Sequence, residues 1–302
     1  MENNIPQAAA KDAHVAVVLV FYNPSESDIQ NARTLSSVYG GVIIDNSDKP
    51  FTDETMIGRM RYVCNHKNLG IAEAQNIGIK HILELGGYRH IVFLDQDSRL
   101  SASYPQDITS EFIHISSTVT NLASLGPTVS NKDTGEEYRS AIHTYQTDEN
   151  GFSQRRHIIS SGSCIPTKIL RDVGFMDGGM FIDYVDYEWC WRAASKGYVC
   201  GITSKIHINH KVGKKELHIG NYKIIISAPF RYYYQYRNYF WLIRKKYVPL
   251  QWKIATGIKF SLRLVYFPLI VDGGTECWKF IIKGIKHGVR QENRRIDCIV
   301  QP

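Results

Sequence analysis

The sequence predicts an α/β protein with a mostly parallel central sheet flanked by helices. Between residues 15 and 95, short apolar runs rich in Val, Ile and Leu alternate with segments of helical periodicity. This order of strand, helix, strand, strand, helix, strand is typical of parallel sheets. The composition agrees, since 43% of the 302 residues are hydrophobic and 22% are charged, as in an ordinary globular protein. The same values exclude a disordered or fibrous chain.

The elements of the first third can be placed one by one. The run VAVVLVF at 15–21 predicts a strand buried on both faces, because no polar residue interrupts it. Ser25 and Asp28 form a capping-box pattern that starts a helix, and the glycine pair at 40–41 ends it. Apolar and small residues at helical spacing predict a second helix at 71–85. Further strands are expected at 42–45, 61–64 and 90–94.

The rest of the chain divides less sharply. We expect a strand within 118–127, a polar loop over 132–151, a short helix at 165–173 and a longer helix from 183 to 196. In domain terms, residues 1–13 are expected to be a flexible N-terminus without a signal-peptide pattern, 14–215 the α/β domain, and 216–302 a helical extension. The six cysteines contain no CxxC pair, so neither a structural zinc site nor a disulfide framework is expected, which fits a reducing cytoplasm.

Polar residues follow each of the first four strands. They are Asn23, Asp45-Asn46, Asn68 in the segment after the third strand, and Asp95-Gln96-Asp97. In open parallel sheets, ligands bind at the carboxyl ends of the strands. Four polar strand ends at one edge therefore predict a nucleotide pocket.

Three of these positions suggest particular chemistry. Asp95 and Asp97, on a turn after a buried strand, suit Mg²⁺ or Mn²⁺, which take oxygen ligands and are often held by one or two carboxylates and substrate phosphates. The alternative is a turn or a helix cap. Asp45 can accept hydrogen bonds from a pyrimidine or a ribose, or it can form an Asx turn. Asn68 and Gly70 precede a helix whose N-terminus can face a diphosphate.

A second group of candidates lies further along the chain. Asp186 stands near the start of a helix, where it could act as a general base or as an N-cap. Glu188 and Arg192 are four residues apart, so an intrahelical ion pair is the structural alternative for Glu188. His210, at the edge of a basic region, could complete a metal or diphosphate site or be an ordinary core or surface residue.

Taken together, the motifs resemble those of family 2 glycosyltransferases, and in particular of bacterial rhamnosyltransferases that build O-antigen and related polysaccharides. The resemblance covers roughly residues 14–215. It rests on N-x-G-x-A-x-A-x-N-x-G from Asn68 to Gly78, LDQDS from Leu94 to Ser98, and IDYVD-x-EWC-x-R from Ile182 to Arg192. It implies a GT-A fold, a nucleotide-sugar donor and an inverting mechanism.

The resemblance also implies roles for single residues. Asp97 is expected to bind the metal, with His210 assisting at the metal or the diphosphate, and Asp95 to lie against the donor ribose. Asp186 is the expected base, although Val185 replaces an acid common in the family and leaves Asp183 and Glu188 as rivals. The expected donor-binding residues are Asn23, Asp45, Asn46, Asn68, Gly70, Asp95 and Gln96. The expected acceptor-binding residues are Ser161, Gly162, Asp183 and Glu188.

The expected reaction follows from the resemblance. L-Rhamnose from dTDP-β-L-rhamnose is transferred with inversion to a hydroxyl of a polyprenyl-diphosphate-linked precursor, giving an α-L-rhamnoside. A UDP- or GDP-hexose donor is the alternative, because no single residue reports the sugar. A non-catalytic family member is a further alternative, against which the intact Asp95, Asp97 and Asp186 argue.

The last third of the chain has a different charge from the body. Residues 211–302 carry 18 Lys/Arg and 5 Asp/Glu, whereas residues 1–210 carry 18 and 24. Ten aromatic residues between 230 and 252 are interleaved with basic ones, a composition that suits a membrane interface, and the alternative is a packed helix pair with a solvated basic face. Residues 254–271 contain Lys259 and Arg263 and are therefore predicted to lie in an interface or pack as a helix rather than span a bilayer.

Peripheral attachment to the cytoplasmic face of a bacterial inner membrane follows as an expectation. The alternative partner for a basic aromatic region is nucleic acid, whose bases stack on aromatic rings. Nucleic acid is not expected here, because it would leave the acidic body and the Asp-x-Asp motif without a role. The sequence leaves homo-oligomerisation open.

Overall fold

The computed structural model describes residues 14–131, 145–210, 215–219, 222–271 and 273–292. The expected flexible N-terminus, 1–13, and most of the expected loop at 132–151 lie outside these residues.

A mixed sheet of nine strands forms the centre of the molecule, in the order β3-β4-β2-β1-β5-β8-β6-β9-β7. The strands β4, β2, β1 and β5 are parallel, as expected from their continuous apolar runs. In the other half, β8 is antiparallel to β5 and β6, and β7 is antiparallel to β9. The strands are β1 (Val15–Phe21), β2 (Gly41–Asp45), β3 (Met56–Ile57), β4 (Met60–Cys64), β5 (His90–Asp95), β6 (Leu122–Asn131), β7 (Phe152–Arg155), β8 (Cys164–Pro166) and β9 (Val199–His210).

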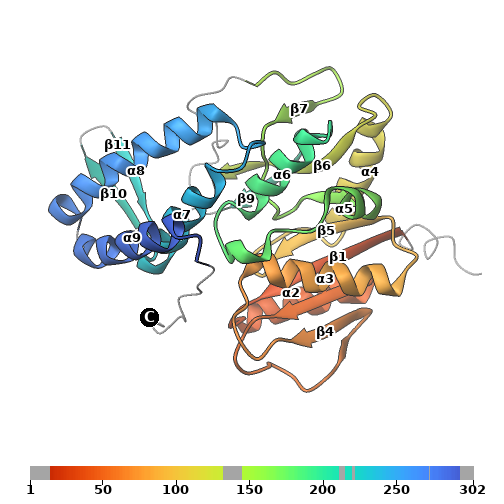
Figure 1. Ribbon diagram of the computed structural model, residues 1–302. Coiled ribbons are helices and arrows are strands. Elements are labelled where there is room, and N and C mark those ends of the chain that lie inside the picture. The colour runs from red at the N-terminus through yellow and green to blue at the C-terminus, as the bar shows by residue number, and fades with distance from the viewer. Residues whose placement is uncertain (1–13, 132–144, 211–214, 220–221, 272, 293–302) are drawn as a thin grey trace, which may run out of the picture.

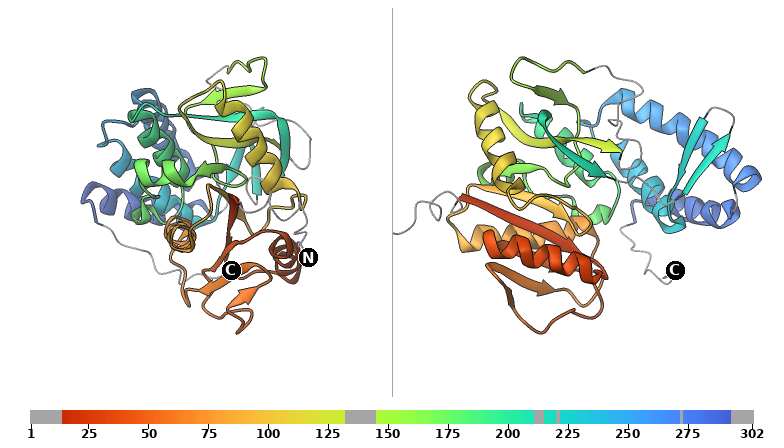
Figure 2. Two further views of the ribbon diagram at one scale, coloured as in Figure 1. Left: turned by 90° about the vertical axis from the view of Figure 1, so that its right-hand side faces the viewer. Right: turned by 180° about the vertical axis from the view of Figure 1, so that it is seen from behind.

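Helices cover both faces of this sheet (Figures 1 and 2). Alternate residues of β1 point to opposite faces: Val15, Val17 and Leu19 pack with residues of α2 and α4, and Val18 and Val20 pack with residues of α3, α5 and α6. The helices of this domain are α2 (Glu26–Val38), α3 (Ile71–Leu85), α4 (Tyr104–Ser116), α5 (Thr167–Val173) and α6 (Val185–Ser195), with a 3₁₀ turn at Gly178–Met180.

The predicted boundaries of the elements expected between residues 15 and 95 are confirmed to within one residue, whereas the strand expected within 118–127 extends as β6 to Asn131. The capping box is present at the start of α2, where the Ser25 side chain accepts from the Asp28 backbone and the Asp28 carboxylate accepts from the Ser25 backbone. Seven of the described elements were not predicted, namely α4 and the strands β3, β7, β8, β9, β10 and β11, and the helix expected from 165 begins only at Thr167, because β8 ends at Pro166. In β9 the register against β6 shifts between Thr203 and His207, so its alternation is broken and the two-residue period is hidden.

The C-terminal region forms a separate group of elements beside the sheet (Figure 1). It contains a two-stranded antiparallel hairpin and three helices that pack on one another. The elements are β10 (Lys215–Ile219), β11 (Tyr222–Ile226), α7 (Pro229–Leu242), α8 (Leu250–Ile270) and α9 (Gly274–Val289). A helical extension was expected here, and the exact domain boundary at 215/216 stays a prediction.

The aromatic residues of the extension do not form the membrane-facing surface that the composition suggested. None of the ten aromatic side chains between 230 and 252, all of which are described, is exposed. Tyr232, Tyr233, Tyr234 and Tyr236 are at most 1% exposed and hold α7 against its neighbours. The physical reason is that α7 lies between the α/β domain and the other two helices, so that most of its circumference is covered. Within the described residues, no helix is long and apolar enough to cross a membrane.

Candidate active site

The carboxyl ends of β1, β2 and β5 meet on the side of the sheet that faces α7 to α9 (Figure 2, right). Backbone-to-side-chain hydrogen bonds join them. The Tyr22 amide donates to Gln96 Oε1 at 2.7 Å, which ties β1 to the loop after β5. The Asn23 amide donates to Ser47 Oγ at 2.7 Å, which ties β1 to the loop after β2. Asn23 itself is exposed and has a positive φ of 49°.

Asp45 is completely buried and acts through its neighbours. Its Oδ1 accepts from the Ser47 amide at 2.9 Å and from Ser47 Oγ at 2.5 Å, which is the Asx turn that was the alternative to a binding role. Its Oδ2 accepts from the Tyr62 hydroxyl at 2.7 Å. Burial and the neighbouring Asp45 carboxylate raise the pKa of Tyr62, so that this tyrosine stays a donor. Asp45 therefore orients Ser47 in the loop after β2, and both oxygens of its carboxylate already accept hydrogen bonds within the protein.

Asn46 and Asn68 prepare the N-terminus of α3. Asn46 Nδ2 donates to the Gly70 carbonyl at 3.1 Å, and Asn46 Oδ1 accepts from Asn65 Nδ2 at 2.9 Å. Asn68 Oδ1 accepts from the Gly70 amide at 2.9 Å. Gly70 has a φ of 82°, and a Cβ there would come within 2.5 Å of the Phe181 carbonyl oxygen. Only glycine allows this close approach between the start of α3 and the loop before α6.

The Asp-x-Asp turn follows β5 directly. Asp95 is half-buried and Asp97 is exposed. Arg99 holds the turn from behind, since its guanidinium donates to the Gln96 carbonyl at 3.0 Å and forms a 2.5 Å ion pair with the buried Asp28. The capping box of α2 thus also supports this turn, a second role for Asp28 that the sequence did not reveal.

Ser161 and Gly162 lie against the same turn. Ser161 is 4% exposed, and its hydroxyl is 3.0 Å from the hydroxyl of Ser98. The Gly162 amide donates to the Phe93 carbonyl at 2.7 Å, and the Tyr104 hydroxyl donates to the Gly162 carbonyl at 2.6 Å. Both residues therefore connect β5 to the segment entering β8, and the acceptor contacts expected for them stay a prediction.

Asp186 lies in the first turn of α6, next to the Asp-x-Asp turn. Its carboxylate accepts hydrogen bonds from the backbone amides of Tyr187 and Ser160. Burial raises the pKa of Asp186 to about 6, the backbone hydrogen bonds oppose this shift, and the nearby Asp95 carboxylate adds to it. A carboxylate with a pKa close to neutral is suited to take a proton from a hydroxyl.

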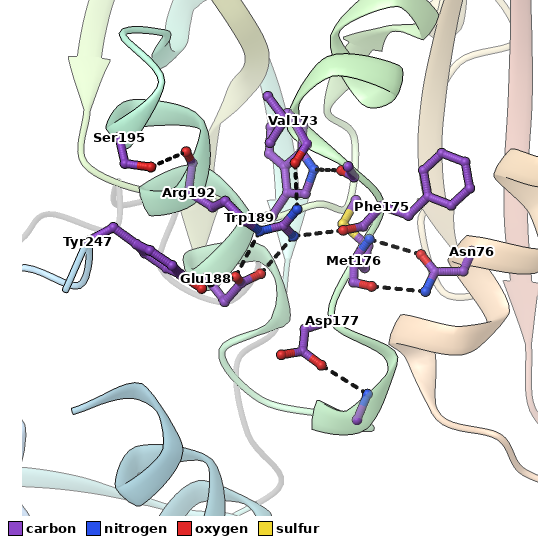
Figure 3. A network of polar contacts seen from close by, with 12 residues as sticks. Asn76, Val173, Phe175, Met176, Asp177, Glu188, Trp189, Arg192, Ser195 and Tyr247 are labelled. Carbon is purple, nitrogen blue, oxygen red and sulfur yellow. Dashed lines mark hydrogen bonds and ion pairs between the residues drawn. The ribbon is translucent and has the colours of Figure 1, made fainter. Parts of the chain in front are cut away.

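The two rivals for the role of base are held elsewhere. Asp183 forms a bidentate ion pair with Arg231 of α7, at 2.6 and 3.2 Å. Glu188 is 1% exposed, and both its oxygens are bound by Arg192 at 2.9 Å, with the Tyr247 hydroxyl donating to Oε1 at 2.5 Å (Figure 3). The intrahelical pair proposed as the alternative for Glu188 is therefore present.

The Glu188 cluster connects α6 to the segment after α5 (Figure 3). Arg192 also donates to the backbone carbonyls of Val173 and Phe175, at 2.8 and 2.7 Å. Asn76 of α3 exchanges two hydrogen bonds of 2.9 Å with the backbone of Met176. These contacts fix α6, and with it Asp186, relative to α3.

Helix α7 braces the loop that leads into α6. Asn238 is fully buried, and its Nδ2 lies 2.9–3.0 Å from the carbonyls of Met180, Ile182 and Asp183. Arg237, also fully buried, donates to the carbonyls of Gly179 and Met180. In this loop three residues other than glycine have positive φ angles of 65–66°, a conformation that costs of the order of 1–3 kcal/mol each. They are Phe181, Asp183 and Tyr184. The extension is thus part of the frame of the site.

The donor set of the Asp-x-Asp turn fits a hard divalent cation. Asp97 offers exposed carboxylate oxygens at the open edge of the sheet, and oxygen is the ligand that Mg²⁺ and Mn²⁺ prefer. Among the described residues, no group of three or more His, Cys, Asp or Glu side chains forms a complete metal site. A cation here would therefore need ligands from substrate phosphates. The backbone of His210 is described at the end of β9, but its side chain lies outside the description, so its role stays a prediction.

Sequence reasoning missed several residues of the site. Gln75 Nε2 donates to Ser160 Oγ at 3.1 Å, next to the amide that bonds Asp186. His157 stacks on Tyr187 with a ring-centre distance of 3.6 Å. The residues around Gln75 and His157 in the sequence do not indicate these contacts, because each contact is made with a partner that lies far away in the chain. Only the motif from 68 to 78 indicated that this part of α3 belongs to the site.

Comparisons with known proteins agree with this geometry. No family model matches the chain. The dTDP-rhamnosyl transferase RfbF of Shigella flexneri is 31% identical over 278 residues, which are 86% of this chain and 87% of that protein. The low-salt glycan biosynthesis hexosyltransferase Agl10 of Haloferax volcanii is 22% identical over 218 residues, 64% of this chain and 66% of that protein.

Solved structures show the same fold. Residues 1–349 of S. aureus TarS superpose with a TM-score of 0.55 and 13% identity, over 93% of this chain and 82% of that one. GalNAc-T7 with UDP, GalNAc and Mn²⁺ superposes with a TM-score of 0.52 and 14% identity, over 92% and 56%. With 31% identity to the Shigella flexneri enzyme over most of both chains, this protein belongs to the family 2 glycosyltransferases of GT-A fold and is a member of the group that includes the bacterial rhamnosyltransferases.

Proposed function

We propose that this glycosyltransferase moves L-rhamnose from dTDP-β-L-rhamnose to a hydroxyl of a lipid-linked polysaccharide precursor, with inversion at the anomeric carbon. The observation that carries the proposal is the position of Asp186, a half-buried carboxylate with a pKa near neutrality beside the Asp-x-Asp turn. The choice of donor is supported by the similarity to a dTDP-rhamnosyl transferase.

The donor is proposed to lie across the carboxyl ends of β1, β2 and β5. Asn23, Gln96 and Asp95 line this edge, with Asp95 nearest the ribose. Asp45 and Asn46 act indirectly, because Asp45 orients Ser47 and Asn46 holds the start of α3. The N-terminus of α3, with Asn68 and Gly70, then presents backbone amides toward the diphosphate.

Asp97 is the proposed protein ligand of a Mg²⁺ or Mn²⁺ ion, and His210 is a proposed second one. When bound, such an ion neutralises negative charge on the diphosphate as it leaves. The similar GalNAc-T7 structure contains Mn²⁺.

Asp186 is the proposed general base. As the acceptor oxygen forms a bond to the anomeric carbon, the hydroxyl proton passes to the Asp186 carboxylate. The bond from the anomeric carbon to the diphosphate breaks, and its electron pair leaves with dTDP. A positioned base of this kind contributes about 10²–10⁴-fold to the rate. Because attack is from the face opposite the diphosphate, the product is an α-L-rhamnoside.

A polyprenyl-diphosphate-linked acceptor places the enzyme at the cytoplasmic face of the inner membrane, where we propose that it attaches peripherally. The buried aromatic residues of α7 do not supply the attachment surface. The charge of residues 211–302 still favours an anionic surface.

The test is transfer of labelled rhamnose from dTDP-β-L-rhamnose to lipid extracts of a strain that makes the precursor. We expect transfer with the wild type, loss of at least about 10²-fold with Asp186→Asn, and an α-linked product. UDP- and GDP-hexoses are the competing donors, since a structure similar to this one was solved with UDP-GlcNAc. Efficient transfer from one of them and none from dTDP-rhamnose would replace the donor and keep the reaction class.

A further inference from the structure

Helix α8 exposes a continuous row of apolar side chains. Each of its members is between 55% and 77% exposed, and they are spaced four, four, four, three and four residues apart, so they lie along one side of the helix. The members, which we call the α8 ridge, are Leu250, Ile254, Ile258, Leu262, Val265 and Leu269. Apolar patches of this extent are uncommon on monomeric proteins and mark interaction sites.

The opposite side of α8 already provides its packing. Phe260 stacks on Tyr236 with ring centres 4.1 Å apart, and Phe267 packs edge-on to Tyr232 at 5.0 Å. Arg263 is only 6% exposed and lies over the rings of Tyr232, Phe260 and Phe267. The α8 ridge is therefore not needed for the core, and the described residues leave it uncovered.

Charge identifies the kind of partner. Within α8, which is described throughout, Lys259 is the one exposed charged side chain. The next helix, α9, exposes a row of basic residues, and Trp278 and Ile282 beside them are 39% and 40% exposed. This row, the α9 basic face, consists of Lys279, Lys283, Lys286 and Arg290.

Two copies of such a surface repel one another, whereas an anionic lipid surface attracts it. The dimensions and amphipathic character of helix α8 also suit a position on a lipid surface. A helix of 21 residues is about 31 Å long, and it lies on a bilayer rather than across it, because it is not apolar all round.

We propose that the α8 ridge and the α9 basic face dock the protein on a bilayer that contains anionic phospholipids. The ridge enters the boundary between headgroups and acyl chains, and the basic face contacts the phosphates. The purpose of this docking surface, which is to bring the active site to a lipid-linked acceptor, rests on the proposed function. The binding of the surface to a bilayer does not. Because α7 connects this surface to the loop before Asp186 through Asn238 and Arg231, docking also orients the catalytic edge relative to the membrane.

The experiment is co-sedimentation of the full-length protein with vesicles of phosphatidylethanolamine and phosphatidylglycerol, and with vesicles of phosphatidylcholine alone. The ridge variant is Ile258→Asp with Leu262→Asp. Its matched control is Leu85→Asp with Ile113→Asp, which replaces side chains that are 57% and 55% exposed on α3 and α4. We expect wild type and control to bind the anionic vesicles, and the ridge variant to bind roughly tenfold more weakly.

A charge-reversal pair separates the two parts of the surface. Lys279→Glu with Lys283→Glu is expected to weaken binding to anionic vesicles at low salt, and Lys80→Glu with Lys168→Glu, on α3 and α5, is expected not to. Equal binding by the ridge variant and its control would overturn the proposal. So would a wild-type dimer in solution, measured by light scattering, that the ridge variant converts to monomer, because the ridge would then join two copies.

The proposed function is read separately, from stabilisation of the same variants by dTDP. Vesicle binding without dTDP binding would support the docking surface and refute the proposed donor. Binding of dTDP without vesicle binding would support the donor and refute the docking surface.

Discussion

Asn238 allows the sharpest test of whether the C-terminal extension is part of the catalytic frame. Its amide nitrogen serves three backbone carbonyls of the loop before Asp186, at 2.9–3.0 Å, and its Oδ1 accepts from Arg237. Asn238→Leu keeps the volume and removes these bonds. The amide nitrogen has two N–H donors to share among the three carbonyls, and Oδ1 accepts a third hydrogen bond, so at about 1 kcal/mol net for each of the three bonds the free energy of unfolding should fall by about 3 kcal/mol.

The effect on turnover has a separate cause. Three residues of the braced loop have positive φ angles, and such strain persists only where surrounding contacts impose it. Without Asn238 the loop can relax, and a displacement of about 1 Å at Asp186 is enough to cost roughly 10²-fold in kcat. The donor edge is formed by β1, β2 and β5, so the KM for the donor should change little.

The matched control is Tyr236→Phe, on the same helix. It removes one buried hydrogen bond, from the Tyr236 hydroxyl to the Phe260 carbonyl at 2.8 Å, which faces α8 rather than the loop. Urea unfolding followed by circular dichroism measures stability, and release of dTDP in the presence of lipid acceptor measures kcat and KM. If Asn238→Leu loses stability but keeps the kcat of Tyr236→Phe, the brace is structural only and our reasoning is wrong.

Three further predictions concern single residues of the site. The proposed base works only as a carboxylate, and the pKa of Asp186 is raised to about 6. The value of kcat/KM should therefore be constant above about pH 7 and fall about tenfold per pH unit below pH 6. A profile that stays level down to pH 5 would exclude Asp186 as the base. Glu188→Gln leaves Arg192 without its charge partner, so the free energy of unfolding, measured in urea, should fall by about 3 kcal/mol while the KM for the donor stays unchanged. A raised KM would indicate that Glu188 binds the donor directly. Gly70→Ala should lower both Tm and dTDP affinity, because its Cβ would meet the Phe181 carbonyl at 2.5 Å, and an unaltered Tm would show that this contact is loose.

Local patterns accounted for the parallel half of the sheet. Uninterrupted apolar runs specify strands buried on both faces, and Ser25 with Asp28 specifies the start of α2, so these elements need no tertiary information. Helix α4 has buried residues at 104, 108, 112 and 115, a helical period, but many Ser and Thr residues around it weaken the signal. The register shift in β9 hides that strand.

The candidate site was predictable to the extent that it lies at strand ends. The positions of Asn23, Asp45, Asp95 and Asp97 follow from the parallel topology alone. What the sequence could not show is which polar groups are already satisfied. Asp45 is bound by Ser47 and by Tyr62, 17 residues away, and Asp183 is bound by Arg231, 48 residues away, so both pairings depend on the completed fold.

The C-terminal extension was misread for a related reason. Aromatic residues among basic ones are as typical of a tightly packed helix pair as of a membrane interface, and composition alone does not tell which side of a helix is covered. In the structure, the tyrosines of α7 are buried and the apolar ridge of α8 is exposed. The distinction required the packing of three helices, which no local window contains.

We propose that the carboxyl ends of β1, β2 and β5 bind a dTDP-sugar together with a divalent cation held by Asp97. The most direct measurement is thermal unfolding of the wild type and of Asp97→Ala with dTDP, UDP or GDP, each with and without Mn²⁺. A nucleotide at 100 times its Kd should stabilise the wild type by about 2.7 kcal/mol. We predict this shift with dTDP only when Mn²⁺ is present, and its loss in Asp97→Ala. An equal shift in both proteins, or none with any nucleotide, would contradict the account.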